Sequence, residues 1–444
     1  MKWFTAGLLA FLLPVVVPGK ANAQADGSTA LMLAIDRNDL EGATRLIRAH
    51  TDVNTANEYG ATALWIAAAR GNVQVMKLLL DAHANPNVAL LSGETPLMTA
   101  VDNGHTDVVK LLLDRKADAN ARETRGGQTA LMWAAANRFA DIVELLLEHG
   151  ADSGARSTHG FTPLLFAAQQ GDVESGRLLL RAGADVNDRG GNDRKTALIV
   201  AAASGNGNFS TLLLDSGADP DLSDESGFTA LHYAAVDAGG ADIVRTLLAH
   251  RANPNPRTTK DSREYIYAGV DLTGATPLFL AASRGNIETV RALLAGGADP
   301  FAKTEKGTAP LHVATWGGSP YAGDWTEDEK RNLLEVTKLL VERGADVNSA
   351  GEHGWTPLHG AAYKGMDAVA QFLVEHGAHL DVFDEYGQTP LSIANAVITL
   401  GSKDFYYQSS RVLRKATVDL LLKLGAKPLS ESGVEVFDLF YKQQ

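Results

Sequence analysis

Residues 160–187, GFTPLLFAAQQGDVESGRLLLRAGADVN, contain the pattern that decides the fold of this 444-residue chain. Thr162 followed by Pro163 predicts a helix start, because threonine caps helix N-termini and proline at the first helical position loses no hydrogen bond. Gly171 is expected to end this apolar helix in a left-handed turn. The second helix, residues 173–182, carries three consecutive leucines and needs cover on more than one side. One such unit cannot bury its leucines alone.

The same unit recurs along the chain, and the leucine equivalent to Leu164 counts the copies. The interval between copies is nearly constant, apart from two longer intervals, Leu231 to Leu278 and Leu311 to Leu358. Copies stacked side by side bury the leucines that one copy exposes, so the sequence predicts one elongated all-α repeat solenoid. The eleven leucines are Leu31, Leu64, Leu97, Leu131, Leu164, Leu198, Leu231, Leu278, Leu311, Leu358 and Leu391.

A period of about 33 residues with Thr-Pro-Leu, Ala-Ala, a leucine triplet and Gly-Ala-Asp-x-Asn resembles the ankyrin repeat. Repeat 10 matches the pattern best, from Thr356-Pro357-Leu358-His359 to Gly377-Ala378. The resemblance covers about residues 27–428 and implies helix-turn-helix repeats joined by β-turn or hairpin loops. It specifies the fold and is almost silent about which molecule is bound.

Residues 1–23 have the pattern of an export signal, with Lys2 at the start, an apolar centre and Ala21-Asn22-Ala23 as the cleavage site. Cleavage is expected before Gln24. The apolar run is short and interrupted by prolines, so no membrane span is predicted. The repeat domain is then 24–428, and 429–444 is predicted to be a capping tail, with a partner-binding peptide as the alternative.

The chain has no cysteine, which excludes disulfides, zinc–thiolate sites and thiol catalysis. Together with the signal, this predicts the periplasm of a Gram-negative bacterium, with secretion as the alternative. The formal charge of −13 argues against nucleic acid and anionic lipid as partners. Selection for a basic partner and simple solubility of a long surface both explain this charge.

Three insertions interrupt the repeats, all in the C-terminal half. They are expected near 255–272 in the outgoing loop of repeat 7, at 317–331 between the helices of repeat 9, and at 399–411 in repeat 11. Repeat 6 has Arg194 in place of the loop glycine, so we expect a distorted turn there and no break in the stack.

The resemblance implies that the residue before each threonine, and the two after Ala-Ala, face a concave groove. In repeats 2 to 5 these residues are mostly small or polar, and in repeats 7 to 11 several are aromatic. Aromatic residues are enriched where proteins dock. The predicted partner-binding residues are Phe228, Tyr265, Tyr267, Trp316, Tyr321, Trp325, Trp355, Tyr363, Lys364, Tyr386 and Tyr406. The alternative is that the aromatic residues of the insertions only pin their own insertions to the stack.

His232, His312 and His359 occupy the family's Thr-Pro-Leu-His position, where the resemblance implies a structural hydrogen bond between neighbouring loops. No nucleophile elbow, phosphate loop or metal-protease motif occurs. The sequence therefore predicts no catalytic residue, no metal and no cofactor.

The first hypothesis is a monomeric, non-enzymatic scaffold that binds a protein through the groove and insertions of repeats 7–11. The second is a small-ligand or enzymatic role in the insertions of repeats 9 and 11. A secreted effector that acts on a host protein is the third.

Overall fold

The computed structural model describes residues 29–259, 272–316, 326–396 and 413–428. The chain forms two compact units, Met1–Asp219 and Pro220–Gln444. Each unit consists of helix pairs, and the predicted all-α repeat solenoid is confirmed. No helix among the described residues has the length and apolar composition that crossing a bilayer requires.

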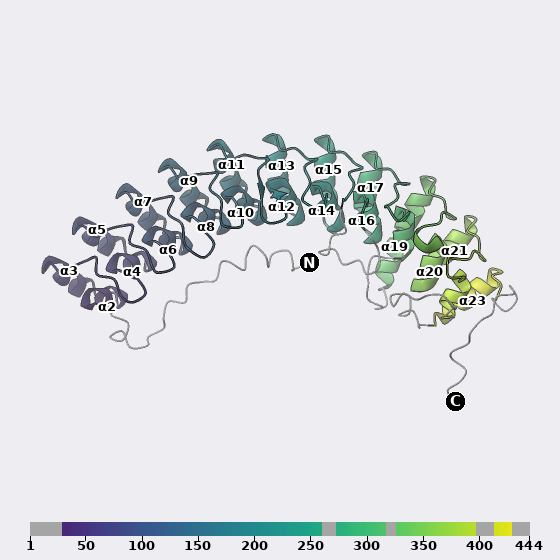
Figure 1. Ribbon diagram of the computed structural model, residues 1–444, viewed down its shortest axis with the longest axis horizontal. Coiled ribbons are helices and arrows are strands. Elements are labelled where there is room, and N and C mark those ends of the chain that lie inside the picture. The colour runs from purple at the N-terminus through teal and green to yellow at the C-terminus, as the bar shows by residue number, and fades with distance from the viewer. Residues whose placement is uncertain (1–28, 260–271, 317–325, 397–412, 429–444) are drawn as a thin grey trace, which may run out of the picture. The chain divides into compact units, whose positions relative to one another are not determined.

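The first unit stacks its helix pairs in two rows. First helices contact first helices of the next pair and second helices contact second helices, as the two labelled rows of this unit show in Figure 1. The pairs are α2 (Ala30–Asp36) and α3 (Leu40–Arg48), α4 (Ala63–Ala69) and α5 (Val73–Asp81), α6 (Pro96–Asp102) and α7 (Thr106–Asp114), α8 (Ala130–Ala136) and α9 (Ala140–Glu148), α10 (Pro163–Gln170) and α11 (Val173–Arg181), and α12 (Ala197–Ala203) and α13 (Gly207–Asp215).

The second unit repeats this arrangement with longer connections. Its described pairs are α14 (Ala230–Val236) and α15 (Ala241–Ala249), α16 (Pro277–Ser283) and α17 (Ile287–Ala295), α18 (Pro310–Trp316) and α19 (Glu327–Glu342), α20 (Pro357–Lys364) and α21 (Asp367–Glu375), and α22 (Pro390–Ala394) and α23 (Lys415–Lys423). A short 3-10 helix, η1 (Glu352–Gly354), precedes α20.

The deciding stretch folds as its residues predict, with one difference. Gly171 ends α10 in the left-handed region, with φ of 67°. Thr162 occupies the N-cap position, but its side chain makes no capping hydrogen bond. Thr62 and Thr129 do accept the expected bond from the third helical residue of their own repeats.

The Asn of the Gly-Ala-Asp-x-Asn ending holds successive repeats in register. In the first unit, Asn54 Oδ1 accepts from the backbone N–H of Asn85 at 2.7 Å, and Asn54 Nδ2 donates to the carbonyl of His83 at 3.3 Å. Asn87 and Asn120 repeat both bonds with the repeats that follow them. Each of these asparagines thus supplies hydrogen-bond partners for backbone groups of the following repeat. The stack therefore satisfies backbone groups that a single repeat would leave unpaired.

Repeat 6 has the distorted turn that Arg194 predicts. β1 (Arg189–Gly190) pairs antiparallel with β2 (Lys195–Thr196), with Arg189 opposite Thr196. Arg194 lies between them with φ of 55°, a conformation that non-glycine residues adopt at some energetic cost. The helices α12 and α13 follow without interruption.

Part of the predicted repeat 9 insertion is helical. Residues 327–331, which were expected to belong to this insertion, form the first turns of α19, which is longer than the other second helices. Thr326 and Glu329 make a reciprocal capping box at its start, and three acids lie in the first turn, where the helix dipole favours negative charge. The rest of this insertion, residues 317–325, lies outside the described residues. So do most of the repeat 7 insertion, the whole repeat 11 insertion, residues 1–28 and the tail from 429.

Candidate partner-binding site

In repeats 3, 4, 5 and 7, the residue before the N-cap threonine, which was expected to face the groove, contacts the residue five positions later, in the first helix of its own repeat. In repeat 3, Thr99 Oγ1 donates to Glu94 Oε1 at 2.8 Å, and in repeat 4, Trp133 Nε1 donates to Gln128 Oε1 at 2.8 Å. Glu94 is 4% exposed, and burial raises its pKa above the usual value. In these two repeats the position therefore belongs to the packing of the repeat.

Aromatic residues at this position form the same contact. The rings of Phe161 and Phe166 lie 6.0 Å apart, and those of Phe228 and Tyr233 lie 5.8 Å apart. Phe228 has no exposed surface, which differs from its predicted place on the binding surface. Because it packs against His232 and Tyr233, it fills the interior of repeat 7.

Repeat 10 is the exception, because the residue five positions after Trp355 is Gly360. Glycine offers no side chain there, and the Trp355 ring lies 5.5 Å from Trp316 of repeat 9 and 5.6 Å from Tyr363. We call Trp316, Trp355 and Tyr363 the aromatic cluster. Trp316 and Tyr363 are half-buried, and Trp355 is 8% exposed. The structure thus brings three of the predicted residues together, on two successive repeats.

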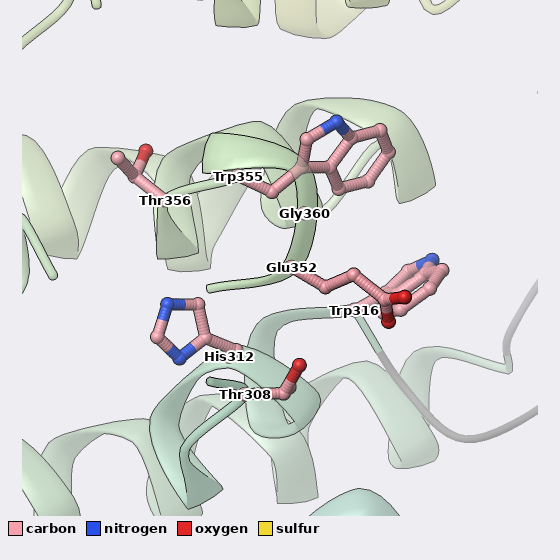
Figure 2. A pocket seen from close by; sticks show the side chains of 7 residues that line it. All are labelled: Thr308, His312, Trp316, Glu352, Trp355, Thr356 and Gly360. Carbon is pink, nitrogen blue, oxygen red and sulfur yellow. The ribbon is translucent and has the colours of Figure 1, made fainter. Parts of the chain in front are cut away.

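A hollow lies beside Gly360, between repeats 9 and 10. Thr308, His312 and Trp316 line it from repeat 9, and Glu352, Trp355, Thr356 and Gly360 line it from repeat 10. Figure 2 shows both indoles and the Glu352 carboxylate toward the same side of this hollow. Its cavity volume of about 20 Å³ leaves room for about one water molecule. The hollow therefore suits the tip of one side chain and is far too small to enclose a metabolite.

Charged groups of both signs surround the aromatic cluster. Glu352 lies at the hollow, with Lys306 Nζ 3.9 Å and His353 Nε2 3.6 Å from its Oε1. Asp384 Oδ2 accepts a hydrogen bond of 3.1 Å from Trp355 Nε1. Burial raises the pKa of Asp384 above its usual value, against the hydrogen bonds that lower it. Two carboxyl groups thus border an aromatic surface.

Comparison with known families decides what kind of repeat carries this site. The family described as ankyrin repeats (three copies) matches residues 31–123, 117–190, 164–258, 262–322 and 329–404. The chain belongs to the ankyrin-repeat family. Ankyrin repeats generally mediate protein–protein interaction, so a stack of them places this chain among the proteins that bind other proteins. No curated protein matches it.

The ankyrin-repeat histidines make the predicted bonds between neighbouring loops. His232 Nδ1 accepts from the backbone N–H of Thr229, and its Nε2 lies 3.2 Å from the carbonyl oxygen of Ala275. His312 and His359 make the equivalent pairs of contacts, with Ser349 and Gln388 as the carbonyl partners. Since one nitrogen accepts a backbone N–H and the other faces a carbonyl, all three rings are held neutral by the loops. Burial lowers the pKa of each to about 4.

Lys364 was predicted to bind the partner, but it is only 7% exposed at the end of α20. Its Nζ lies 5.3 Å from the centre of the Tyr363 ring. Burial, and then the charge of Arg414, lower its pKa to about 8. Lys364 therefore supports the aromatic cluster from inside the ankyrin stack, because its ammonium is largely withdrawn from solvent.

Of the remaining predicted residues, Tyr386 is not part of the aromatic cluster, and the others lie outside the residues that the structure describes. Tyr386 is half-buried in the loop before α22, with its hydroxyl 3.2 Å from His353 Nδ1. Five residues lie outside the described part of the chain: Tyr265, Tyr267, Tyr321, Trp325 and Tyr406.

Sequence reasoning missed Glu352, Gly360 and Asp384. Gly360 carried a usable signal, because each of the other ten ankyrin repeats has a larger side chain at its position. Those side chains are Leu33, Ile66, Thr99, Trp133, Phe166, Val200, Tyr233, Leu280, Val313 and Ile393. Glu352 and Asp384 carried no such signal, because acids are common in these loops.

Replacing Trp355 with phenylalanine should lower the free energy of unfolding by about 1–2 kcal/mol, since the buried Asp384 carboxyl loses one hydrogen-bond donor while an aromatic ring remains. Urea unfolding of the full chain measures this. Tyr363→Phe, which removes a polar atom and keeps the ring, is the matched control and should change stability by much less. Equal losses in both variants would show that the Trp355 indole N–H contributes little.

Proposed function

We propose that this ankyrin-repeat chain is an exported scaffold that binds a protein partner in the periplasm through repeats 7–11. The aromatic cluster carries this proposal. It is formed by Trp316 and Tyr363 on the first helices of successive repeats and by Trp355 just before α20, and Trp316 and Tyr363 keep part of their ring surface open to solvent. Large aromatic surfaces that lose little rotamer freedom on binding are typical of binding hot spots.

Charge supports a basic partner. The chain carries −13 overall, and Glu352 and Glu385 lie near the cluster with exposed or partly exposed side chains. Complementary charge chiefly raises the association rate and selects among partners. The aromatic cluster would supply most of the affinity, and the acids would guide a basic surface onto it.

Export is proposed from the signal pattern of residues 1–23 and from the absence of cysteine. A stack that buries its leucines between repeats needs no disulfide for stability, which suits an oxidising compartment. Secretion to the medium remains the alternative location, with a host protein as partner.

The small hollow does not favour a small-ligand function at the aromatic cluster, because its volume is about one-tenth or less of a typical ligand pocket. The insertions, where such a role was the alternative, lie largely outside the described residues.

A photo-crosslinking amino acid in place of Tyr363 tests the proposal in cells that produce the full chain. We expect an adduct with a partner protein in the periplasmic fraction, on a chain that begins at Gln24. The same amino acid in place of Tyr59, an exposed tyrosine of repeat 2, is the matched control and should give no such adduct.

Trp316→Ala should reduce the Tyr363 adduct at least about ten-fold, as expected for a hot-spot residue. Thermal unfolding of the variant shows whether the stack is intact. An adduct of equal yield from the Tyr59 position, or one that Trp316→Ala leaves unchanged, would remove the aromatic cluster as the binding site.

A further inference from the structure

The hollow beside Gly360 lies where repeat 10 departs from the packing seen in repeats 3, 4, 5 and 7. In repeats 3, 4, 5 and 7, the residue before the threonine contacts the side chain five positions later, as Glu94 contacts Thr99. In repeat 10 this pair is Trp355 and Gly360, so no side chain at position 360 packs against the Trp355 ring, and the hollow lies beside that ring. A side chain from another molecule can contact Trp355 there.

Glycine at this position is unfavourable for the helix itself. Gly360 lies inside α20, where glycine costs about 0.5–1 kcal/mol relative to alanine. A Cβ there would lie 3.0 Å from Thr315 Oγ1 and 3.3 Å from Trp316 Cβ, which is tighter than ordinary packing. Gly360 therefore lets α18 approach α20 closely. This approach sets Trp316 beside Trp355, and among the residues that the structure describes a hollow remains between these indoles and Glu352.

We propose that this hollow receives an arginine side chain of the partner protein. The proposal rests on the proposed scaffold function and specifies the chemistry of its ligand. A guanidinium group is flat, stacks on indole rings and donates in a fork that matches a carboxylate. The hollow offers those complements together: indole surface from Trp316 and Trp355, and the Glu352 carboxylate.

The acidic groups at the hollow favour a positively charged ligand. Asp384 accepts the hydrogen bond of the Trp355 indole, which increases the negative character of that ring, and Glu352 contributes a carboxylate at the hollow itself. Among the described residues, Lys306 Nζ lies 3.9 Å and His353 Nε2 lies 3.6 Å from Glu352 Oε1. Since the Lys306 side chain is 53% exposed and its distance to Glu352 is long for an ion pair, an incoming guanidinium can compete with Lys306 for Glu352.

Tryptophan indole N–H resonances of the full-length, ¹⁵N-labelled protein test this directly, because the chain has only six tryptophans. The probe is the pentapeptide Gly-Ser-Arg-Gly-Ser with blocked ends, compared with peptides that carry citrulline, lysine or norleucine in place of arginine. We expect the arginine peptide to shift the Trp316 and Trp355 resonances saturably. Trp65 and Trp133, in the first unit, are internal controls and should not move.

Three variants separate charge from shape. Glu352→Gln should weaken the apparent affinity of the arginine peptide at least about three-fold, and Lys306→Gln should strengthen it, because it removes the competing cation. Glu327→Gln removes one exposed acid at the start of α19 and should leave the affinity unchanged. The citrulline peptide, equal in shape and uncharged, should bind several-fold more weakly than arginine.

Other occupants give other results. Equal shifts with the norleucine or citrulline peptide would overturn the proposal in favour of an apolar or neutral side chain. No shift with any peptide would overturn it too, and would indicate that the protein's own chain fills the hollow. A crosslinked adduct at Tyr363 that persists at full yield in Glu352→Gln would reject arginine recognition and keep the scaffold. Peptide binding without any adduct would reject the scaffold alone.

Discussion

At pH 5 the second unit should be less stable than at pH 7 by about 5–6 kcal/mol of unfolding free energy, through three histidines that titrate near 6.5 once unfolded. The first unit should lose much less. His232, His312 and His359 all lie in the second unit, and burial lowers the pKa of each to about 4. Each histidine accounts for about 2 kcal/mol of the loss. The total is comparable with the whole stability of a typical domain.

The sign follows from which state binds the proton. Above pH 6.5 all three rings are neutral in both states, and their contribution to stability is complete. As the pH falls from about 6.5 to 4, the unfolded chain takes up protons that the folded loops exclude, so unfolding becomes favourable. Below about 4, protonation of the folded rings removes their acceptor nitrogens and the loop bonds fail.

Carboxyl groups with raised pKa work in the opposite direction. Burial raises the pKa of Glu94 and Asp102 in the first unit, so these groups add stability as the pH falls. Asp384 does the same in the second unit and offsets a part of the histidine loss. Lowering the pH should therefore make the second unit less stable than the first.

Urea unfolding at pH 7, 6 and 5 measures the effect when the native indole resonances are followed individually. Those of Trp316 and Trp355 should disappear at progressively lower urea concentration, and those of Trp65 and Trp133 should change little. The matched control replaces the three histidines with phenylalanine, which repeat 8 carries at this position as the buried Phe279. This variant should be less stable at pH 7 and nearly insensitive to acid. If lowering the pH destabilised both units of the wild type equally, the pH dependence could not be assigned to these histidines.

Phe209→Ala should lower the free energy of unfolding of the first unit by about 3–5 kcal/mol, the usual cost of deleting a buried phenylalanine side chain. Phe209 is fully buried on α13. A Cβ on Gly176 of α11 would lie 2.5 Å from its ring, so the phenyl ring occupies space that only glycine leaves open. The two positions compensate each other across neighbouring repeats.

The reciprocal change gives the control for this prediction. Gly176→Val alone should destabilise through a clash, and Gly176→Val with Phe209→Ile should recover a large part of the loss, since Val143 and Ile142 occupy the equivalent positions in repeat 4. Urea unfolding of the wild type, Gly176→Val, Phe209→Ile and the double variant measures the coupling between the two sites. Strictly additive effects would show that the two side chains do not depend on each other.

The sequence by itself determined the helix pairs and their order. Thr-Pro starts, the glycine of positive φ at Gly171 and the leucine triplets act within one repeat, so their consequences can be read from local pattern. The histidines at Thr-Pro-Leu-His were predicted for the same reason, because the resemblance places one partner in the repeat itself and the other in the next loop. The helical end of the repeat 9 insertion was not predicted, although Thr326 and Glu329 form the capping box that begins α19 there.

Only the tertiary structure decided which side chains meet between repeats. Trp355 was predicted to face the groove, and it is almost wholly buried, because the contact that covers it comes from Trp316 of the preceding repeat. Gly360 was not singled out, because the absence of a side chain matters only when the neighbouring surfaces are known. Periodicity specifies the positions that face a neighbour, whereas the volume and charge left between two neighbours depend on both of them together. The hollow proposed to receive a partner's side chain depends in this way on residues of two repeats, and a single repeat does not reveal it.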